Sequence, residues 1–228
     1  MTLIAVLDYG IGNLRSAQKA LQKVGADARL TADPGLIRDA AGVVLPGVGA
    51  FGRCMEELRR SGLDELAVEA VEADRPFLGI CIGMQMLYRG SEESPDVPGL
   101  GLLPGRVRRL SDEVKRPQMQ WNVLNPVDRG PAGPAAMLAG LSEPTWVYFV
   151  HSYSPDVTDD VVATCDYGRP VTAAVERGNL WATQFHPEKS AANGLRLLGN
   201  FVDLAERSGG GATATSAGYG ESASGSTT

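Results

Sequence analysis

The chain has 228 residues and a formal net charge of -6 at pH 7, with 43% hydrophobic and 21% charged residues. This length and composition are typical of a globular protein with one α/β domain and a full core, or with two small domains. The acidic balance argues against nucleic-acid binding, which calls for a basic face, and no run approaches the ~20 apolar residues that cross a bilayer.

Cysteine and histidine usage limits the possible chemistry. The chain has 3 cysteines at scattered positions, which favours a reducing, cytoplasmic location over a disulfide framework. The first residues enter an apolar segment directly, without the basic start of a secretory signal. Since there are only 2 histidines, we expect no metal site. We also expect no cofactor.

The first half of the chain alternates apolar runs with segments of helical periodicity. The apolar runs predict buried strands at 3–7, 42–45 and 76–80. Helices are predicted at 14–24 and as a pair across 53–73. Within the pair, Ser61 followed by Asp64 and Glu65 is typical of a helix start. This alternation predicts a parallel sheet with helices on both faces.

The second half is rich in Val, Thr, Tyr and Trp, with turn residues between short runs. Strands are predicted at 106–110, 118–124, 146–150, 161–166, 171–176 and 180–184. The tripeptide Arg177-Gly178-Asn179 favours a hairpin turn, and a last helix is expected at about 191–206. Residues 208–228 are nearly all Gly, Ser, Ala and Thr, so we expect one domain at 1–207 and a disordered tail at 208–228.

Cys81 lies between two glycines, directly after the apolar run at 76–80. This pattern predicts a strand that turns sharply into a helix and holds the cysteine in a strained, accessible position. Buried structural cysteine is the more common fate of this residue type, and we assign that fate to Cys54 and Cys165.

His186 and Glu188 follow the predicted strand at 180–184. Alternate residues of an extended segment point to the same side, so Glu188 can orient His186 while His186 faces a nucleophile from elsewhere. Cys81, His186 and Glu188 therefore form a candidate nucleophilic triad. The other histidine, His151, is expected to be a packing residue.

The glycine-rich segment 46–49 lies at the carboxyl end of another predicted strand, where ligands bind in open α/β sheets. It lacks the Lys and Ser/Thr of a phosphate-binding loop. Its better use is to present backbone N–H groups to an oxyanion, together with the N–H of Ile82.

These motifs carry a family resemblance. Gly79-Ile80-Cys81-Ile82-Gly83-Met84-Gln85 and Phe185-His186-Pro187-Glu188-Lys189-Ser190 resemble the signatures of class I glutamine amidotransferases. Within that class, the chain is most similar to the family of glutaminase subunits of imidazole glycerol phosphate synthase. That closer resemblance rests on segments 8–14, 46–51, 90–93, 120–122, 149–153 and 199–201. One departure is Gln120, where many members have glycine.

The resemblance implies a flavodoxin-like open, mostly parallel central sheet with flanking helices and an added set of antiparallel strands. It also implies that Cys81, His186 and Glu188 hydrolyse glutamine through a thioester, with the N–H groups of Val48 and Ile82 as the oxyanion hole. The glutamine-binding residues that it implies are Gly49, Gln85, Ser152 and Tyr153.

The resemblance further implies a partner that uses the ammonia. In the family this partner is a separate (β/α)8 barrel cyclase of histidine biosynthesis, which forms a heterodimer with the glutaminase. Asn13, Trp121 and Tyr148 are the expected interface residues. Two alternatives stay open: a glutaminase subunit of another pathway, and a non-catalytic flavodoxin-like cysteine sensor, which would not need His186 and Glu188.

Overall fold

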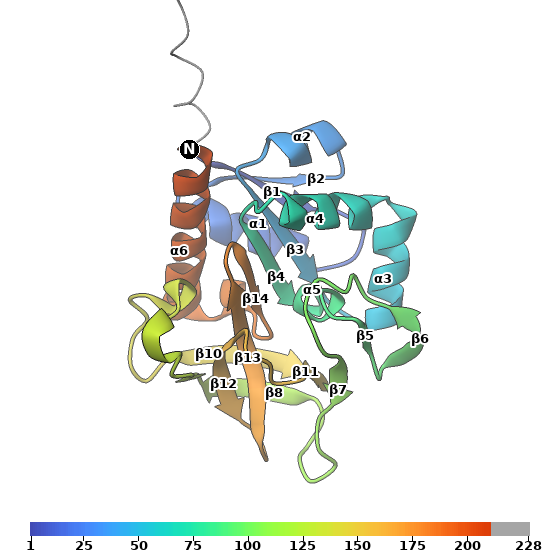
Figure 1. Ribbon diagram of the computed structural model, residues 1–228, viewed down its shortest axis with the longest axis vertical. Helices are drawn as coiled ribbons and strands as arrows, with labels where there is room; N and C mark the ends of the chain where they lie inside the picture. Colours follow the sequence, from blue (N-terminus) through green and yellow to red (C-terminus); the bar gives the residue numbers. More distant parts are fainter. Residues whose placement is uncertain (211–228) are drawn as a thin grey trace, which may run out of the picture.

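A computed structural model of the protein describes residues 1–210 of the chain. Its centre is an eight-stranded sheet with the strand order β2-β1-β3-β4-β14-β13-β12-β9 (Figure 1). The parallel part consists of β2 (Asp27–Thr31), β1 (Leu3–Leu7), β3 (Gly42–Gly47), β4 (Phe77–Cys81) and β14 (Leu180–Thr183). Antiparallel pairing then adds β13 (Pro170–Arg177), β12 (Val161–Asp166) and β9 (Asn125–Pro126). The sheet is therefore open, with a parallel core extended by antiparallel strands.

Helices cover both faces of the parallel strands (Figure 1). Crossovers between parallel strands are right-handed, and the chain reverses direction across the sheet after β2, so α1 and α2 lie on opposite faces. The first face carries α1 (Leu14–Lys23) and α6 (Ala191–Gly210), which pack together. The second face carries α2 (Pro34–Asp39), α3 (Phe51–Arg60) and α4 (Leu63–Glu72).

Two small sheets complete the fold beside the antiparallel strands. The first pairs β8 (Gln118–Val123) with β10 (Trp146–His151). The second has the order β11-β7-β5-β6, with β11 (Tyr153–Pro155), β7 (Val107–Arg109), β5 (Gly90–Ser91) and β6 (Ser94–Pro98). The remaining elements are α5 (Ile82–Met86), η1 (Gly130–Ala132), η2 (Ala136–Leu138) and η3 (Pro187–Lys189).

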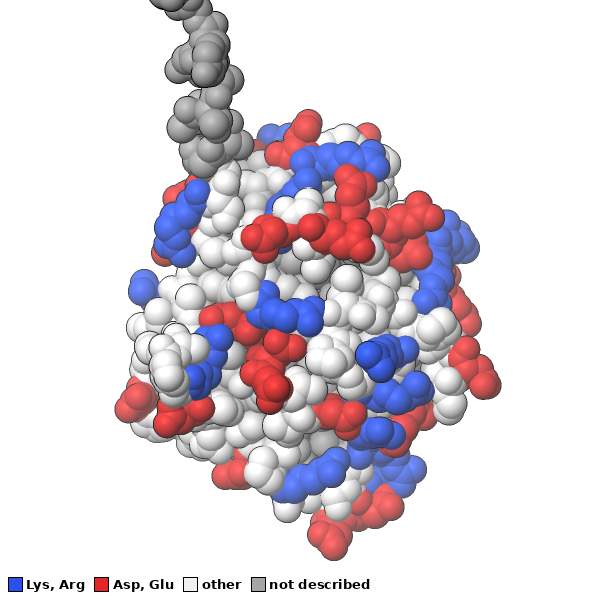
Figure 2. Space-filling view, viewed as in Figure 1, with Lys and Arg blue, Asp and Glu red and all other residues white. Residues whose placement is uncertain are grey.

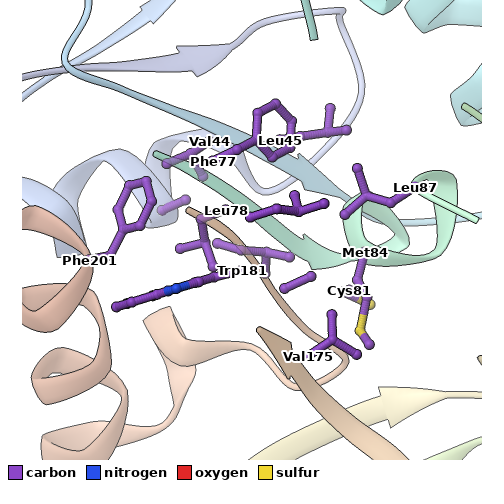
Figure 3. Close-up of a cluster of buried hydrophobic side chains, with 14 of the residues drawn as sticks. Val44, Leu45, Phe77, Leu78, Cys81, Met84, Leu87, Val175, Trp181 and Phe201 are labelled. Carbon is purple, nitrogen blue, oxygen red and sulfur yellow. The ribbon is translucent and has the colours of Figure 1, made fainter. Parts of the chain in front are cut away.

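The core between sheet and helices reaches the end of β4 (Figure 3). Trp181 of β14 and Phe201 of α6 meet with ring centroids 6.1 Å apart. At the other end of this cluster, Cys81 adjoins Met84 and Val175 (Figure 3). Because the cluster is fully buried, the strand that carries Cys81 has a rigid support.

The structure confirms most predicted elements and differs from the predictions at several places. Sequence analysis missed the strand β2 and the six-residue helix α2, and also the short strands β5, β6, β9 and β11. The residue before α4 is Gly62 in a left-handed conformation, and the hydroxyl of Ser61 donates to Leu58 O instead of capping that helix. The helix α3 begins at Phe51, two residues before the predicted start.

A further difference is at the predicted tail. The last helix continues to Gly210, so 208–210 are helical and not part of a disordered tail. The remainder of that prediction, 211–228, lies outside the described residues.

Charged side chains of both signs are interspersed on the face seen in Figure 2. Surface ion pairs occur as well, such as Arg38 Nε with Glu69 Oε1 at 2.8 Å. Within residues 1–210, no helix has the length and apolar character needed to span a membrane.

Candidate active site

Cys81 occupies the predicted turn between β4 and α5, with φ 56° and ψ −110°. A positive φ is costly for a residue with a side chain and persists only where surrounding structure imposes it. Here the first turn of α5 packs directly on β3. The packing is so close that a Cβ atom added to Gly83 would lie 1.8 Å from Leu45 O. The glycine after Cys81 therefore permits the close approach that bends the chain, as the sequence predicted.

Three neighbouring strands bring the predicted groups to one edge of the sheet. Gly47, at the end of β3, is paired with Cys81, at the end of β4. Next to β4 lies β14, whose continuation carries His186. Parallel strands present their carboxyl ends at the same edge, and this is where open α/β sheets bind ligands.

His186 and Glu188 are joined by a hydrogen bond of 2.8 Å between Nδ1 and Oε1. The expected contact is present, but the predicted extended geometry is wrong. His186 is extended, whereas Glu188 lies in the 3-10 turn η3, which curls the carboxylate back toward the imidazole. The backbone of His186 is fixed on both sides, by its N–H to Tyr148 O at 3.0 Å and by the Ser190 hydroxyl to its carbonyl at 2.7 Å.

The surroundings of His186 favour its protonated form. Burial works against a charged imidazole, but the interactions with Cys81 and Glu188 outweigh burial and raise the pKa of His186 to about 10. The second ring nitrogen, Nε2, is buried and makes no hydrogen bond to another described residue. Because Nδ1 is engaged by Glu188, Nε2 is the atom available for proton exchange at Cys81.

A cavity of about 460 Å³ unites most of the predicted site residues. Its lining includes Cys81, His186, Val48, Ile82, Gly49, Gln85, Ser152 and Tyr153. Glu188 lies behind His186, with its side chain only 3% exposed. Among the predicted interface residues, Asn13 also lines the cavity, whereas Trp121 and Tyr148 lie outside its lining.

Two carbonyl groups are held by side chains where β3 passes into the following loop. Tyr9 donates its hydroxyl to Pro46 O at 2.7 Å, and the Cys54 thiol donates to Val48 O at 3.4 Å. Burial raises the pKa of Tyr9 far above its usual value, so the phenol remains a neutral donor. The peptide between Gly47 and Val48 lies between these two anchored carbonyls. Sequence analysis did not identify Tyr9 as a support of this loop.

Gln85 and Gln184 form a buried pair beside the nucleophile. Gln85 Nε2 donates to Tyr153 O and to Gln184 Oε1, each at 3.0 Å. Gln184 Nε2 in turn lies 3.8 Å from Cys81 Sγ. Gln184 was missed, although its position two residues before His186 at the end of a predicted strand could have suggested it.

The other cysteines and His151 have the buried settings that were expected of them. Burial raises the pKa of the Cys54 and Cys165 thiols to about 11 each, so neither is disposed to act as a thiolate. Burial lowers the pKa of His151 to about 4, which keeps its imidazole neutral. Among residues 1–210, no group of three or more His, Cys, Asp and Glu side chains is arranged to hold a metal ion.

Comparisons with known proteins agree with this geometry. A model of the family described as glutamine amidotransferase class-I matches residues 5–204. The chain belongs to this family. Two relatives of this amidotransferase chain carry the name imidazole glycerol phosphate synthase subunit HisH. The one from Syntrophotalea carbinolica is 48% identical over an alignment of 211 residues, which covers 89% of this chain and 100% of that protein. The one from Methanothermobacter thermautotrophicus is 49% identical over 203 residues, which are 89% of this chain and 98% of that protein.

Solved structures share the fold of this amidotransferase chain at low sequence identity. A structure described as PurLQS from Thermotoga maritima has a TM-score of 0.70 and 19% identity, over 89% of this chain and 98% of that one. A structure described as a glutamine amidotransferase has a TM-score of 0.69 and 22% identity, over 89% of this chain and 98% of that one. The predicted class I amidotransferase fold is thus confirmed.

Proposed function

We propose that this chain is the glutaminase subunit of an imidazole glycerol phosphate synthase. The observation that carries the proposal is the meeting of a strained Cys81 and His186 in one cavity, with Glu188 buried behind the imidazole and bonded to it. A cysteine sensor can use a cation beside its thiol, but it does not need an imidazole that a carboxylate orients to give a proton to a leaving group. The names of the relatives at 48% and 49% identity favour histidine biosynthesis over another glutaminase pathway.

The proposed reaction begins with attack of the Cys81 thiolate on the side-chain amide carbon of glutamine. A protonated His186 places positive charge next to Sγ, which favours the thiolate. The negative oxygen of the tetrahedral intermediate accepts hydrogen bonds from the backbone N–H groups of Val48 and Ile82. One such donor contributes about 10²- to 10³-fold in rate.

Collapse of the intermediate breaks the bond between carbon and nitrogen. His186 Nε2 gives its proton to the leaving nitrogen, ammonia departs, and a glutamyl thioester remains on Cys81. The neutral imidazole then takes a proton from water, which attacks the thioester and releases glutamate. Glu188 keeps the imidazole in the required tautomer through both steps.

Residues around the cavity are suited to hold an amino acid. The side-chain oxygen Oε1 of Gln85 is buried and makes no hydrogen bond to the described residues. A free acceptor of this kind fits the α-ammonium group of glutamine. We assign Gly49, Ser152 and Tyr153, which also line the cavity, to the remainder of the substrate.

The ribbon of β8 and β10 has an apolar outer face, which we propose as the docking face for a (β/α)8 cyclase. Cross-strand partners share a face, and on this face they are Met119 with Val150, Trp121 with Tyr148, and Val123 with Trp146. Trp121 is 45% exposed and Trp146 is 47% exposed. Large apolar side chains that lie exposed together on one face are typical of a surface that binds another protein. Val150 also lines the cavity, so the same face adjoins the site where ammonia is released.

In this heterodimer the cyclase would combine the ammonia with its nucleotide substrate to give imidazole glycerol phosphate and aminoimidazole carboxamide ribonucleotide. Asn13, at the cavity, would complete the interface with Trp121 and Tyr148. We further propose that the activity resides in one domain, residues 1–207, that it needs no metal or cofactor, and that the protein works in the cytoplasm.

The decisive experiment combines the chain with a histidine-pathway cyclase and its nucleotide substrate. We expect glutamine to support synthesis by the wild type, and Cys81→Ala to abolish it while free ammonia still supports synthesis. Cys165→Ala, a change of the same kind at a buried thiol outside the cavity, should leave both activities intact. Glutamate release without imidazole glycerol phosphate would favour another pathway, and absence of glutamate release would refute the glutaminase proposal.

A further inference from the structure

The orientation of three buried side chains beside the nucleophile is fixed by one backbone carbonyl. Tyr153 O accepts hydrogen bonds from Gln85 Nε2 at 3.0 Å and from His151 Nδ1 at 2.8 Å. A carbonyl oxygen can only accept hydrogen bonds, so the Gln85 atom that faces it is the amide nitrogen, and Nδ1 of His151 carries the hydrogen. If the Gln85 amide turned over it would place an acceptor against an acceptor, and if the His151 ring turned over it would lose this hydrogen bond.

This constraint passes to the next side chain in the network. The same amide nitrogen of Gln85 lies 3.0 Å from Gln184, and since it donates, the Gln184 atom it meets is Oε1. The amide nitrogen of Gln184 is then directed to the other side, where it lies 3.8 Å from Cys81 Sγ. Both glutamines are almost inaccessible to water, at 1% and 0% exposure.

An amide N–H directed at sulfur distinguishes between the two forms of a cysteine. Hydrogen bonds to an ionised acceptor are about twice as strong as those to a neutral one, so the donor favours the thiolate over the thiol. Its effect is largest where water is excluded, as it is at Gln184. The backbone of Gln184 is held as well, by its N–H to Ala173 O at 2.8 Å, so the donor is preorganised.

We propose that Gln184 is a further catalytic residue, whose amide N–H stabilises the Cys81 thiolate and connects the nucleophile through Gln85 to the substrate-binding part of the cavity. This inference rests on the proposed glutaminase function and extends it by one donor. A hydrogen bond from the substrate to Gln85 Oε1 would hold the Gln85 amide more firmly in place. It would thereby strengthen the hydrogen bond from Gln85 to Gln184 and the contact of the Gln184 amide with Sγ. Glutamine binding and nucleophile activation would then share one hydrogen-bonded chain.

The molecule contains a matched control for this contact. Gln118, which is also fully buried, directs its Nε2 to Cys165 Sγ at 3.6 Å. Neither Gln118 nor Cys165 lines the cavity. The same substitution at Gln118 therefore removes the same kind of contact from a thiol that takes no part in the reaction.

The experiment compares Gln184→Met, which keeps the length of the side chain, and Gln184→Glu, which keeps its shape, with Gln118→Met. Alkylation of Cys81 by iodoacetamide is followed across pH 5–10 by mass spectrometry in the full chain, and glutaminase kinetics are measured in the complex with the cyclase. Loss of a hydrogen bond to a charged group should slow alkylation near neutral pH and lower kcat by about 10- to 100-fold. The pH at which alkylation reaches half its maximal rate should rise, and should rise further with Gln184→Glu, whose carboxylate repels the thiolate.

We expect Gln118→Met to leave the alkylation profile of Cys81 unchanged. A wild-type profile in a folded Gln184→Met or Gln184→Glu chain would overturn the inference, as would an equal shift with Gln118→Met. Alkylation does not depend on glutamine hydrolysis, so the two proposals can fail separately. If Cys81 of the wild type shows the expected alkylation profile but the complex hydrolyses no glutamine, the proposed function alone is refuted.

Discussion

Nδ1 of His186 lies 2.8 Å from Oε1 of Glu188, and the two side chains are 2% and 3% exposed. A carboxylate held so close in a dry setting determines which ring nitrogen carries the exchangeable proton. It also adds to the interaction with Cys81 that raises the pKa of His186 to about 10. This environment therefore favours the charged imidazole before glutamine arrives.

Glu188→Gln should reduce glutaminase activity by disturbing this arrangement. We expect kcat to fall by about 10²- to 10⁴-fold, because the amide can hold the imidazole in the wrong tautomer. The pKa of His186 should fall from about 10, so the alkaline limb of the kcat profile should move to lower pH. Steady-state kinetics over pH 6–10 in the cyclase complex would measure both, with ammonia-dependent synthesis as the control. A variant with normal kcat and an unmoved alkaline limb would contradict the role given to Glu188.

Tyr9→Phe should destabilise the fold at the loop after β3. The change removes the donor to Pro46 O and leaves a buried carbonyl unsatisfied, at a cost of about 1–3 kcal/mol in the free energy of unfolding. Tyr88→Phe is the matched control, since the buried hydroxyl of Tyr88 has no hydrogen-bond partner among the described residues. Its removal should be neutral or stabilising. Urea unfolding of the three proteins would test this, and equal losses in both variants would contradict it.

His151 should make the protein less stable as the pH falls. Its pKa is about 4 in the folded chain against 6.5 ordinarily, so the unfolded chain takes up the proton first. Stability that is complete above pH 6.5 is then lost as the pH falls toward 4, by roughly 3 kcal/mol in total. His186 adds little slope below pH 6.5, because there it is protonated in both states; its contribution is lost progressively as the pH rises from 6.5 toward 10.

The test of this dependence is His151→Gln, which replaces the imidazole by a group that does not titrate. The free energy of unfolding of the variant, measured by urea denaturation from pH 4 to 7.5, should decline less steeply with acid than that of the wild type. Parallel curves for the two proteins would show that His151 is not the source.

Trp121→Ala should weaken association with the cyclase. A central, half-exposed tryptophan on an apolar face commonly contributes about 2 kcal/mol or more to binding, which is a rise in Kd of about 30-fold. Val157→Ala is the control, since Val157 is 62% exposed but lies outside the β8–β10 ribbon. Calorimetric titration with the cyclase would measure both variants. Unchanged affinity for Trp121→Ala would place the docking face elsewhere.

Local sequence rules predicted much of this protein because the decisive features are local. Glycines on both sides of Cys81 predict the turn, and apolar runs of four to six residues predict the buried strands that end at the site. Among the missed elements, β2 (Asp27–Thr31) is the edge strand of the central sheet, is only partly buried and carries two charged residues. Its apolar pattern is weak for that reason.

Sequence alone determined which residues this protein has for chemistry: one cysteine on a strained turn, one histidine beside a glutamate, and a glycine-rich loop after a strand. Only the tertiary structure decided which polar side chains support them. Tyr9 meets Pro46 from 37 positions away, and Gln85 meets Gln184 from 99 positions away. Such contacts depend on the order of strands in the sheet, because parallel pairing of β3, β4 and β14 brings distant segments to one edge. The hydrophobic pattern of a single segment cannot predict which distant residue will form a hydrogen bond with a buried amide or phenol.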